Sequence, residues 1–128
     1  MGVESISLAD STGLASPRTI RSTLSDLLIR AGETPIVLHL HDTRGLGIAN
    51  IVTALQMGID RFDTSFGGMG GCPFIPGATG NVATEDVVHL CNSLGISSGV
   101  DNSIVASCAR RMAQHRGQPL PGKLYRLI

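Results

Sequence analysis

Short strand-like segments alternate with amphipathic segments along the first half of this chain. Residues 6–9, 35–41 and 59–65 are predicted strands, because each is a short run bounded by turn residues. Residues 46–57 repeat apolar side chains at helical spacing. In the segment before the second strand the same spacing recurs at Ile20, Leu24, Leu27 and Leu28. Helices between successive strands predict parallel strands with right-handed crossovers, and therefore an α/β fold, either a doubly wound sheet or a barrel.

Capping residues mark the expected helix boundaries. Ser16 is a predicted N-cap with Pro17 in the first helical position, and Gly32 ends that helix. A third helix is expected to open at Asn81, with two acidic residues in its first turn. A fourth, at about residues 102–115, precedes a tail that we expect to be loose at its end.

Composition narrows the class of protein. Hydrophobic residues make up 42% of the chain, but it has no Trp, one Tyr and three Phe, so we expect an aliphatic core. The formal net charge is zero and the basic residues are scattered, which argues against a nucleic-acid partner. We expect a soluble protein, or a soluble part of one, with no membrane partner and no targeting segment, because no run of about 20 apolar residues and no basic N-terminal flank occurs.

The three cysteines carry no Cys-x-x-Cys spacing, which favours a reducing compartment. Cys91 and Cys108 fall on predicted helices and are expected to be small core residues. Cys72 lies instead in the glycine-rich stretch at residues 67–80, which is too long for a tight turn and is predicted to be an ordered functional loop. A thiol there can act as acid, base or nucleophile, and the alternative is an incidental loop cysteine.

Two histidines at alternate positions are the clearest chemical signal. His39 and His41 end the second strand, and because strand side chains repeat every two residues, both project from the same face. Two neutral imidazoles on one face can chelate a divalent cation, with Mg²⁺ or Mn²⁺ preferred if oxygen ligands complete the shell. Asn81 is a candidate amide-oxygen ligand. The alternatives are two half-exposed histidines satisfied by hydrogen bonds, and an ordinary helix N-cap at Asn81.

Polar residues gather at the predicted carboxyl ends of the three strands. These ends carry Asp10, the histidine pair, and Ser65 with the glycine-rich stretch. Barrels and doubly wound sheets both place active sites there. Polar side chains on a central strand face need a wet or metal-filled space, which a barrel mouth offers and a helix-covered face does not. We therefore favour a barrel.

The chain resembles 3-hydroxy-3-methylglutaryl-CoA (HMG-CoA) lyases over nearly its whole length. The motifs that carry the resemblance lie at residues 39–45, 54–58, 68–74 and 76–86. The wider group of pyruvate-carboxyltransferase-type barrels, including isopropylmalate and homocitrate synthases, shares the two-histidine strand. Those synthases usually carry a Gly-Glu-Arg-type sequence where this chain has Gly70-Gly71-Cys72-Pro73, so the cysteine loop indicates the lyase.

The resemblance implies that residues 1–128 are the C-terminal portion of a TIM barrel, roughly its last three β/α units and a C-terminal helix. It also implies a divalent cation, Mg²⁺ or Mn²⁺, held by His39, His41 and Asn81 with an aspartate from the first barrel strand. That aspartate and a neighbouring catalytic arginine have no counterpart in this chain. Asp10 resembles a family active-site aspartate, and Cys72 matches the catalytic cysteine.

The implied reaction is a retro-Claisen cleavage of HMG-CoA to acetyl-CoA and acetoacetate. Cys72 is the expected proton donor to the enolate, with His39 or Asp10 handling the hydroxyl proton. The implied partners are an acyl-CoA substrate and a second copy or a complementary N-terminal half. The implied location is the cytoplasm of a bacterium or the mitochondrial matrix of a eukaryote. The alternatives are a related aldolase or synthase acting on another hydroxy-acyl-CoA or keto acid, and an inactive truncated fragment.

Overall fold

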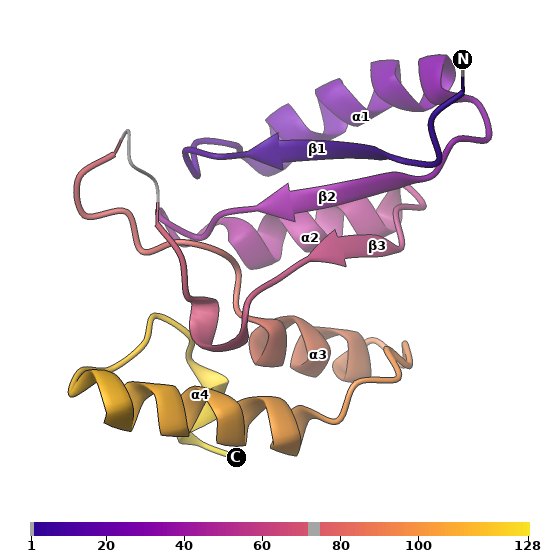
Figure 1. Ribbon diagram of the computed structural model, residues 1–128. Coiled ribbons are helices and arrows are strands. Elements are labelled where there is room, and N and C mark those ends of the chain that lie inside the picture. Colours follow the sequence, from indigo (N-terminus) through magenta and orange to yellow (C-terminus); the bar gives the residue numbers. More distant parts are fainter. Residues whose placement is uncertain (1, 72–74) are drawn as a thin grey trace.

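The computed structural model describes residues 2–71 and 75–128, and within them three strands alternate with helices (Figure 1). In chain order the elements are β1 (Ile6–Asp10), α1 (Pro17–Ala31), β2 (Ile36–Leu40), α2 (Gly47–Gln56), β3 (Arg61–Asp63), the 3₁₀ turn η1 (Phe66–Gly68), α3 (Thr84–Ser93), α4 (Asn102–Arg116) and the 3₁₀ turn η2 (Leu124–Arg126).

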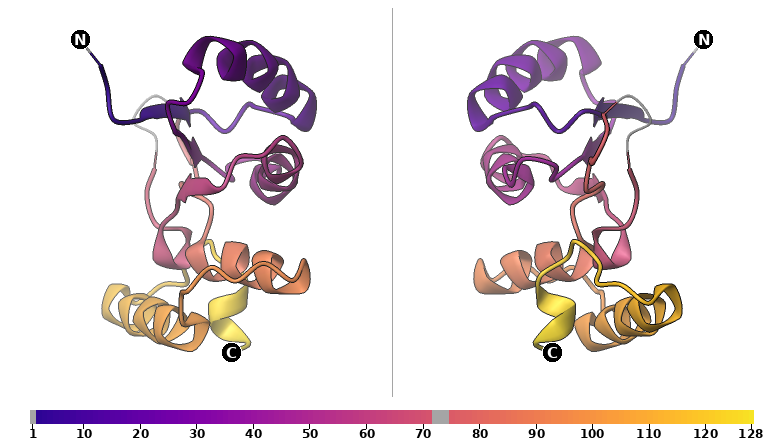
Figure 2. Two further views of the ribbon diagram at one scale, coloured as in Figure 1. Left: turned by 90° about the vertical axis from the view of Figure 1, so that its right-hand side faces the viewer. Right: turned by 90° about the vertical axis from the view of Figure 1, so that its left-hand side faces the viewer.

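The three strands form one parallel sheet in the order β1-β2-β3, which confirms the predicted α/β fold. Ala9 lies opposite His39, and His39 lies opposite Asp63 on the other side. Helices α1 and α2 cover one face of this sheet, whereas the other face carries no helix in the described part of the chain (Figures 1 and 2). The carboxyl ends of the strands meet at the edge where the glycine-rich loop leaves β3 (Figure 1).

The core lies between the sheet and the two helices that cover it. Along β2, Ile36, Leu38 and Leu40 are buried and alternate with less buried residues, as expected for a strand covered on one face. Leu24 of α1 and Ile51 of α2 belong to the same cluster. This alternation leaves His39 on the face opposite the helices.

The expected cap of the first helix is confirmed. The Ser16 hydroxyl accepts a hydrogen bond from the Thr19 amide at 3.3 Å, and Pro17 occupies the first helical position, where its missing N–H costs nothing. Gly32 ends the helix with a φ of +57°, a value that favours glycine.

The prediction that a third helix opens at Asn81 is wrong. Helix α3 begins at Thr84, and Asn81 forms an isolated antiparallel bridge with His41. The Val82 amide donates to the Leu40 carbonyl at 3.1 Å, so this segment stays extended beside the end of β2. Asn81 is therefore not a helix N-cap. The predicted strand 59–65 is also shorter, since β3 ends at Asp63.

The C-terminal tail packs against the protein more closely than expected. Leu120 and Tyr125 are buried against α4, and the exposed large hydrophobic side chains of the tail are Leu127 and Ile128, at its end. The carboxylate of Asp86, itself 8% exposed, accepts hydrogen bonds from the backbone amides of Lys123 and Leu124. The tail is thus tied to the first turn of α3.

Helix α4 differs from expectation at one cysteine. Cys108 is exposed, whereas Cys91 on α3 is buried as predicted. Helix α4 buries Ala106 and Ala109 instead, because these small side chains face the tail residue Tyr125 and its neighbours. None of the helices described is both long and apolar enough to cross a membrane.

Candidate metal centre

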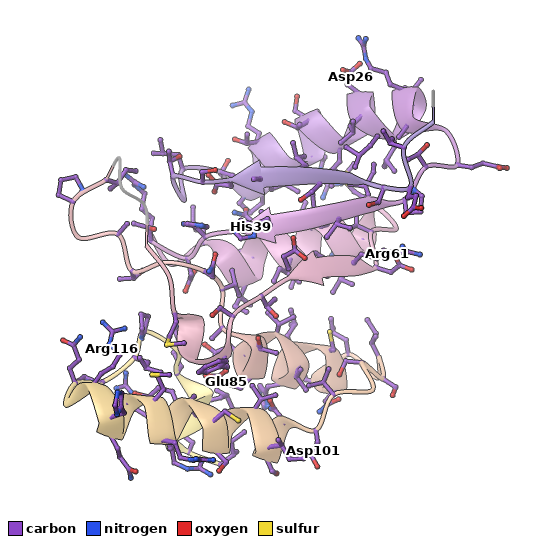
Figure 3. The ribbon with its side chains drawn as sticks, in the orientation of Figure 1. Asp26, His39, Arg61, Glu85, Asp101 and Arg116 are labelled. Carbon is purple, nitrogen blue, oxygen red and sulfur yellow. The ribbon has the colours of Figure 1, made fainter. Side chains whose placement is uncertain are left out.

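The two histidines meet at the carboxyl end of β2, as the strand periodicity predicted. The Nε2 atoms of His39 and His41 lie 3.2 Å apart, and their ring planes are inclined by 55°. His39 is the penultimate residue of β2, on the sheet face without helices, and is labelled in Figure 3. An octahedral cation with bonds of about 2.1 Å holds two neighbouring ligands about 3.0 Å apart. The observed spacing fits two such ligands.

His41 is the more enclosed of the two imidazoles. It is 7% exposed, and its Nδ1 atom has no hydrogen-bond partner among the described residues. Burial lowers the pKa of His41, the charge of His39 lowers it further, and the Asp10 carboxylate opposes the shift. A lowered pKa keeps the imidazole neutral near pH 7, and only the neutral ring has a lone pair for a metal.

Asn81, which lies opposite His41, carries a side-chain amide. Its backbone pairs with that of His41, and its side-chain Nδ2 donates to the Met69 carbonyl at 2.8 Å. The amide oxygen Oδ1 is buried and accepts no hydrogen bond from the described residues. A buried acceptor without a partner costs about 1–3 kcal/mol. Since the amide nitrogen is already engaged, the free oxygen fits the role of a cation ligand.

Two glycines let the loop pass close to Asn81. A Cβ atom added at Gly70, where φ is +138°, would lie 2.6 Å from Asn81 Nδ2. A Cβ added at Gly80, where φ is +101°, would lie 2.7 Å from the backbone carbon of Gly70. These distances are shorter than any ordinary carbon contact. Glycine is therefore required at positions 70 and 80, where the chain passes itself next to Asn81.

Asp10 lies at the end of β1, where the sequence placed it, and holds the following turn. Its two carboxylate oxygens accept from the backbone amides of Leu14 at 3.1 Å and Ala15 at 2.9 Å. The Thr12 hydroxyl is 3.4 Å from the same carboxylate. Asp10 is near enough to His41 to influence its pKa. A catalytic role for Asp10 stays a prediction.

Acidic residues that the sequence analysis did not assign also surround the site. Asp63 Oδ2 lies 3.9 Å from His39 Nδ1. Asp42, next to His41, accepts from the Gly47 amide at 2.7 Å and so fixes the start of α2, and its other oxygen lies 3.1 Å from Lys123 Nζ. Asp63 could have been identified as a neighbour of His39 from the register of β2 and β3. Asp42 could have been identified because it follows His41 directly in the sequence.

Glu85 is a fully buried carboxylate below the loop (Figure 3). Both of its side-chain oxygens accept from the Gly67 amide, at 3.1 and 3.0 Å. Burial raises the pKa of Glu85, although the hydrogen bond from Gly67 acts in the opposite direction. Glu85 thereby anchors η1, the start of the glycine-rich stretch.

The described residues supply part of a cation shell. No group of three or more His, Cys, Asp or Glu side chains able to hold a metal occurs in residues 2–71 and 75–128. The candidate donors are the two adjacent imidazole nitrogens and the amide oxygen of Asn81, which lies opposite His41, and they suit a divalent cation but do not fill its shell. Cys72, the predicted catalytic thiol, lies outside the described residues.

Comparison with known proteins places the chain in one family. Residues 1–111 match the family model described as HMGL-like. The chain is 45% identical to hydroxymethylglutaryl-CoA lyase YngG of Bacillus subtilis over 95% of its length, and 44% identical to (R)-citramalyl-CoA lyase of Chloroflexus aurantiacus over 94%. It spans 41% and 38% of these two relatives.

A solved structure shares this fold. The HMG-CoA lyase of Acinetobacter baumannii, in complex with coenzyme A and 3-methylmalate, superposes with a TM-score of 0.91 at 39% identity, covering 98% of this chain and 41% of that one. The three parallel strands and their helices thus match part of a lyase barrel. The chain belongs to the HMGL-like family.

Proposed function

We propose that this chain is the C-terminal portion of the barrel of a divalent-metal-dependent lyase that cleaves HMG-CoA to acetyl-CoA and acetoacetate. The observation that carries the proposal is the pair of Nε2 atoms 3.2 Å apart, with Asn81 opposite His41 and its buried amide oxygen accepting no hydrogen bond from the described residues. The HMGL-like family match and the similarity to lyases over nearly the whole chain support the reaction class. The domain assignment proposed is the last three β/α units with the C-terminal helix.

His39, His41 and Asn81 would hold the cation, either Mg²⁺ or Mn²⁺. When bound, such an ion polarises substrate oxygens and lowers the cost of deprotonating the hydroxyl group. His41 is suited to ligation because burial keeps it neutral. Asn81 is suited to it because Met69 fixes the amide nitrogen, and the oxygen accepts no hydrogen bond within residues 2–71 and 75–128. An aspartate from outside these 128 residues would complete the set.

The protein's own proton transfers follow from the bond that breaks. Removal of the C3 hydroxyl proton, for which Asp10 is the candidate base once His39 holds the cation, lets the oxygen's electron pair form a carbonyl as the C2–C3 bond breaks. That bond's electrons leave on the acetyl-CoA fragment as an enolate. Cys72 then donates its proton to the enolate carbon. Acetoacetate and acetyl-CoA result, and the hydroxyl proton remains on the base.

Two acyl groups are candidates for the substrate. The relative from Chloroflexus aurantiacus, which is 44% identical, is a citramalyl-CoA lyase, and this supports citramalyl-CoA as a second candidate substrate. Coenzyme A in the Acinetobacter baumannii complex supports an acyl-CoA substrate in either case. Steady-state cleavage of the two thioesters by the full chain distinguishes them, since the true substrate should have the higher kcat/KM.

Metal binding tests the site directly. Titration of the full chain with Mn²⁺, followed by electron paramagnetic resonance, should give a dissociation constant that His41→Ala and Asn81→Ala each raise at least tenfold. His89→Ala is the matched control, because His89 is an exposed histidine on α3, and it should leave affinity unchanged. Equal affinity in all four proteins would refute the metal site.

The domain assignment has its own test. The DNA upstream of the Met1 codon should encode, in the same reading frame, a β-strand that ends in adjacent aspartate and arginine residues. If it does not, an inactive remnant becomes the better account of this chain. A discrete oligomer on size exclusion would instead support assembly with a second copy or a complementary half, and a polydisperse aggregate would argue against it.

A further inference from the structure

The two ring nitrogens of His39 face different neighbours. Nε2 lies 3.2 Å from His41 Nε2, on the side where the candidate ligands converge. Nδ1 lies 3.9 Å from Asp63 Oδ2, on the opposite side of the ring. A ligand histidine usually donates its second ring N–H to a carboxylate or carbonyl, which selects the tautomer and orients the ring. Asp63 occupies that position.

The pairing of β2 with β3 determines where Asp63 lies relative to His39. Asp63 is the last residue of β3 and lies directly opposite His39 in the parallel register, so both side chains project from the same sheet face. The register of the sheet therefore places the Asp63 carboxylate beside the His39 ring. A one-residue register slip would move it to the other face.

Asp63 has no competing role in the described part of the chain. No described group donates a hydrogen bond to its carboxylate, and the nearby Arg61 pairs with Asp60 at 3.8 Å instead. The side chain of Asp63 is 56% exposed, so it is free to rotate the additional distance to a direct hydrogen bond. A contribution to the hydrophobic core does not explain a charged side chain at this position.

We propose that Asp63 is a positioning residue that accepts the Nδ1–H of His39 and thereby presents the Nε2 lone pair to the cation. The proposal rests on the metal site put forward above. In the metal-free protein, the same tautomer lets His41 donate its Nε2–H to His39 Nε2, which matches the 3.2 Å contact.

The test uses the full chain with ¹⁵N-labelled histidine and three variants. Long-range ¹H–¹⁵N spectra of the metal-free protein report the His39 tautomer, and Mn²⁺ titration reports affinity. Asp63→Ala should move the His39 proton to Nε2 and weaken Mn²⁺ binding about 10–100-fold. Asp63→Asn keeps an acceptor oxygen and should stay within a few-fold of the unmodified chain. Asp60→Ala is the control, because Asp60 is an exposed aspartate at the other end of β3.

Each outcome decides something different. An unchanged tautomer and affinity in Asp63→Ala would overturn the inference while the metal site stands. Equal weakening by Asp63→Asn and Asp63→Ala would also overturn it, because the charge and not the hydrogen bond would then matter. If the unmodified chain binds no Mn²⁺, the proposed metal site fails, and the tautomer of His39 still shows whether Asp63 orients the ring.

Discussion

Gly80→Ala tests whether the glycine-rich stretch positions Asn81. The added Cβ would meet three backbone atoms of Gly70, at 2.7, 2.8 and 3.0 Å, and backbone atoms cannot rotate away as the end of a side chain can. An alanine at position 80 therefore has to move away from the backbone of Gly70, and Asn81, the next residue, moves with it.

Gly77→Ala is a closely matched control for this change. Gly77 also has a positive φ, +76°, but a Cβ there would meet no atom of the described residues within 4 Å. An alanine in the left-handed region costs about 1–2 kcal/mol from backbone sterics alone. Overpacking at Gly80 adds about 1–3 kcal/mol to the backbone cost of an alanine at φ +101°. The difference between the two variants reports the steric contact together with this difference in φ.

The assays are urea unfolding and Mn²⁺ titration of the full chain. Gly80→Ala should unfold at a lower urea concentration than Gly77→Ala, and because displacing Asn81 relieves the contact, its Mn²⁺ affinity should fall tenfold for each ~1.4 kcal/mol needed to return Asn81 to its position. Gly77→Ala should keep its affinity. If both variants lose stability equally and bind Mn²⁺ equally well, the close crossing at Gly80 does not hold Asn81 in place.

Three further predictions concern the core, a buried acid and the thiol. Leu38→Ala should reduce the free energy of unfolding by about 2–5 kcal/mol in urea, whereas Ile29→Ala, at an 84% exposed position, should be close to neutral. The folded-state pKa of Glu85 is raised, so its stabilising contribution is complete below the unfolded pKa and is lost as pH rises through the folded value. Glu85→Gln should therefore flatten the decline of stability across that window, and an unchanged decline would assign it to other groups. Cys72→Ala should lower turnover by orders of magnitude with Mn²⁺ affinity nearly unchanged, and an equal loss of both would make the thiol structural.

Features that depend only on neighbouring residues in the sequence were predicted correctly. The two-residue period of a strand predicted that His39 and His41 share a face, and their Nε2 contact confirms it. The Ser16-Pro17 cap was equally local, because both signals lie within one turn of the helix they begin.

Features that depend on pairing between distant segments were missed. Asn81 resembled a helix N-cap because acidic residues follow it, but its backbone pairs with His41, forty positions earlier, which keeps it extended. The neighbour relation of Asp63 and His39 exists only once the register of β2 and β3 is known. Cys108 was assigned to the core by helical spacing, yet the alanines of α4 face the tail instead.

The hydrogen bonds between the tail and Asp86 of α3 predict how truncating mutations near residue 123 affect the protein. A stop codon at position 123 would remove Lys123 and Leu124, and with them both backbone donors that Asp86 uses. Each hydrogen bond lost by a buried carboxylate costs about 1–3 kcal/mol or more. It would also remove the Lys123 ammonium that reaches Asp42, beside the candidate ligand His41. Late-truncating alleles should therefore behave as loss-of-function alleles, although they leave every proposed ligand encoded.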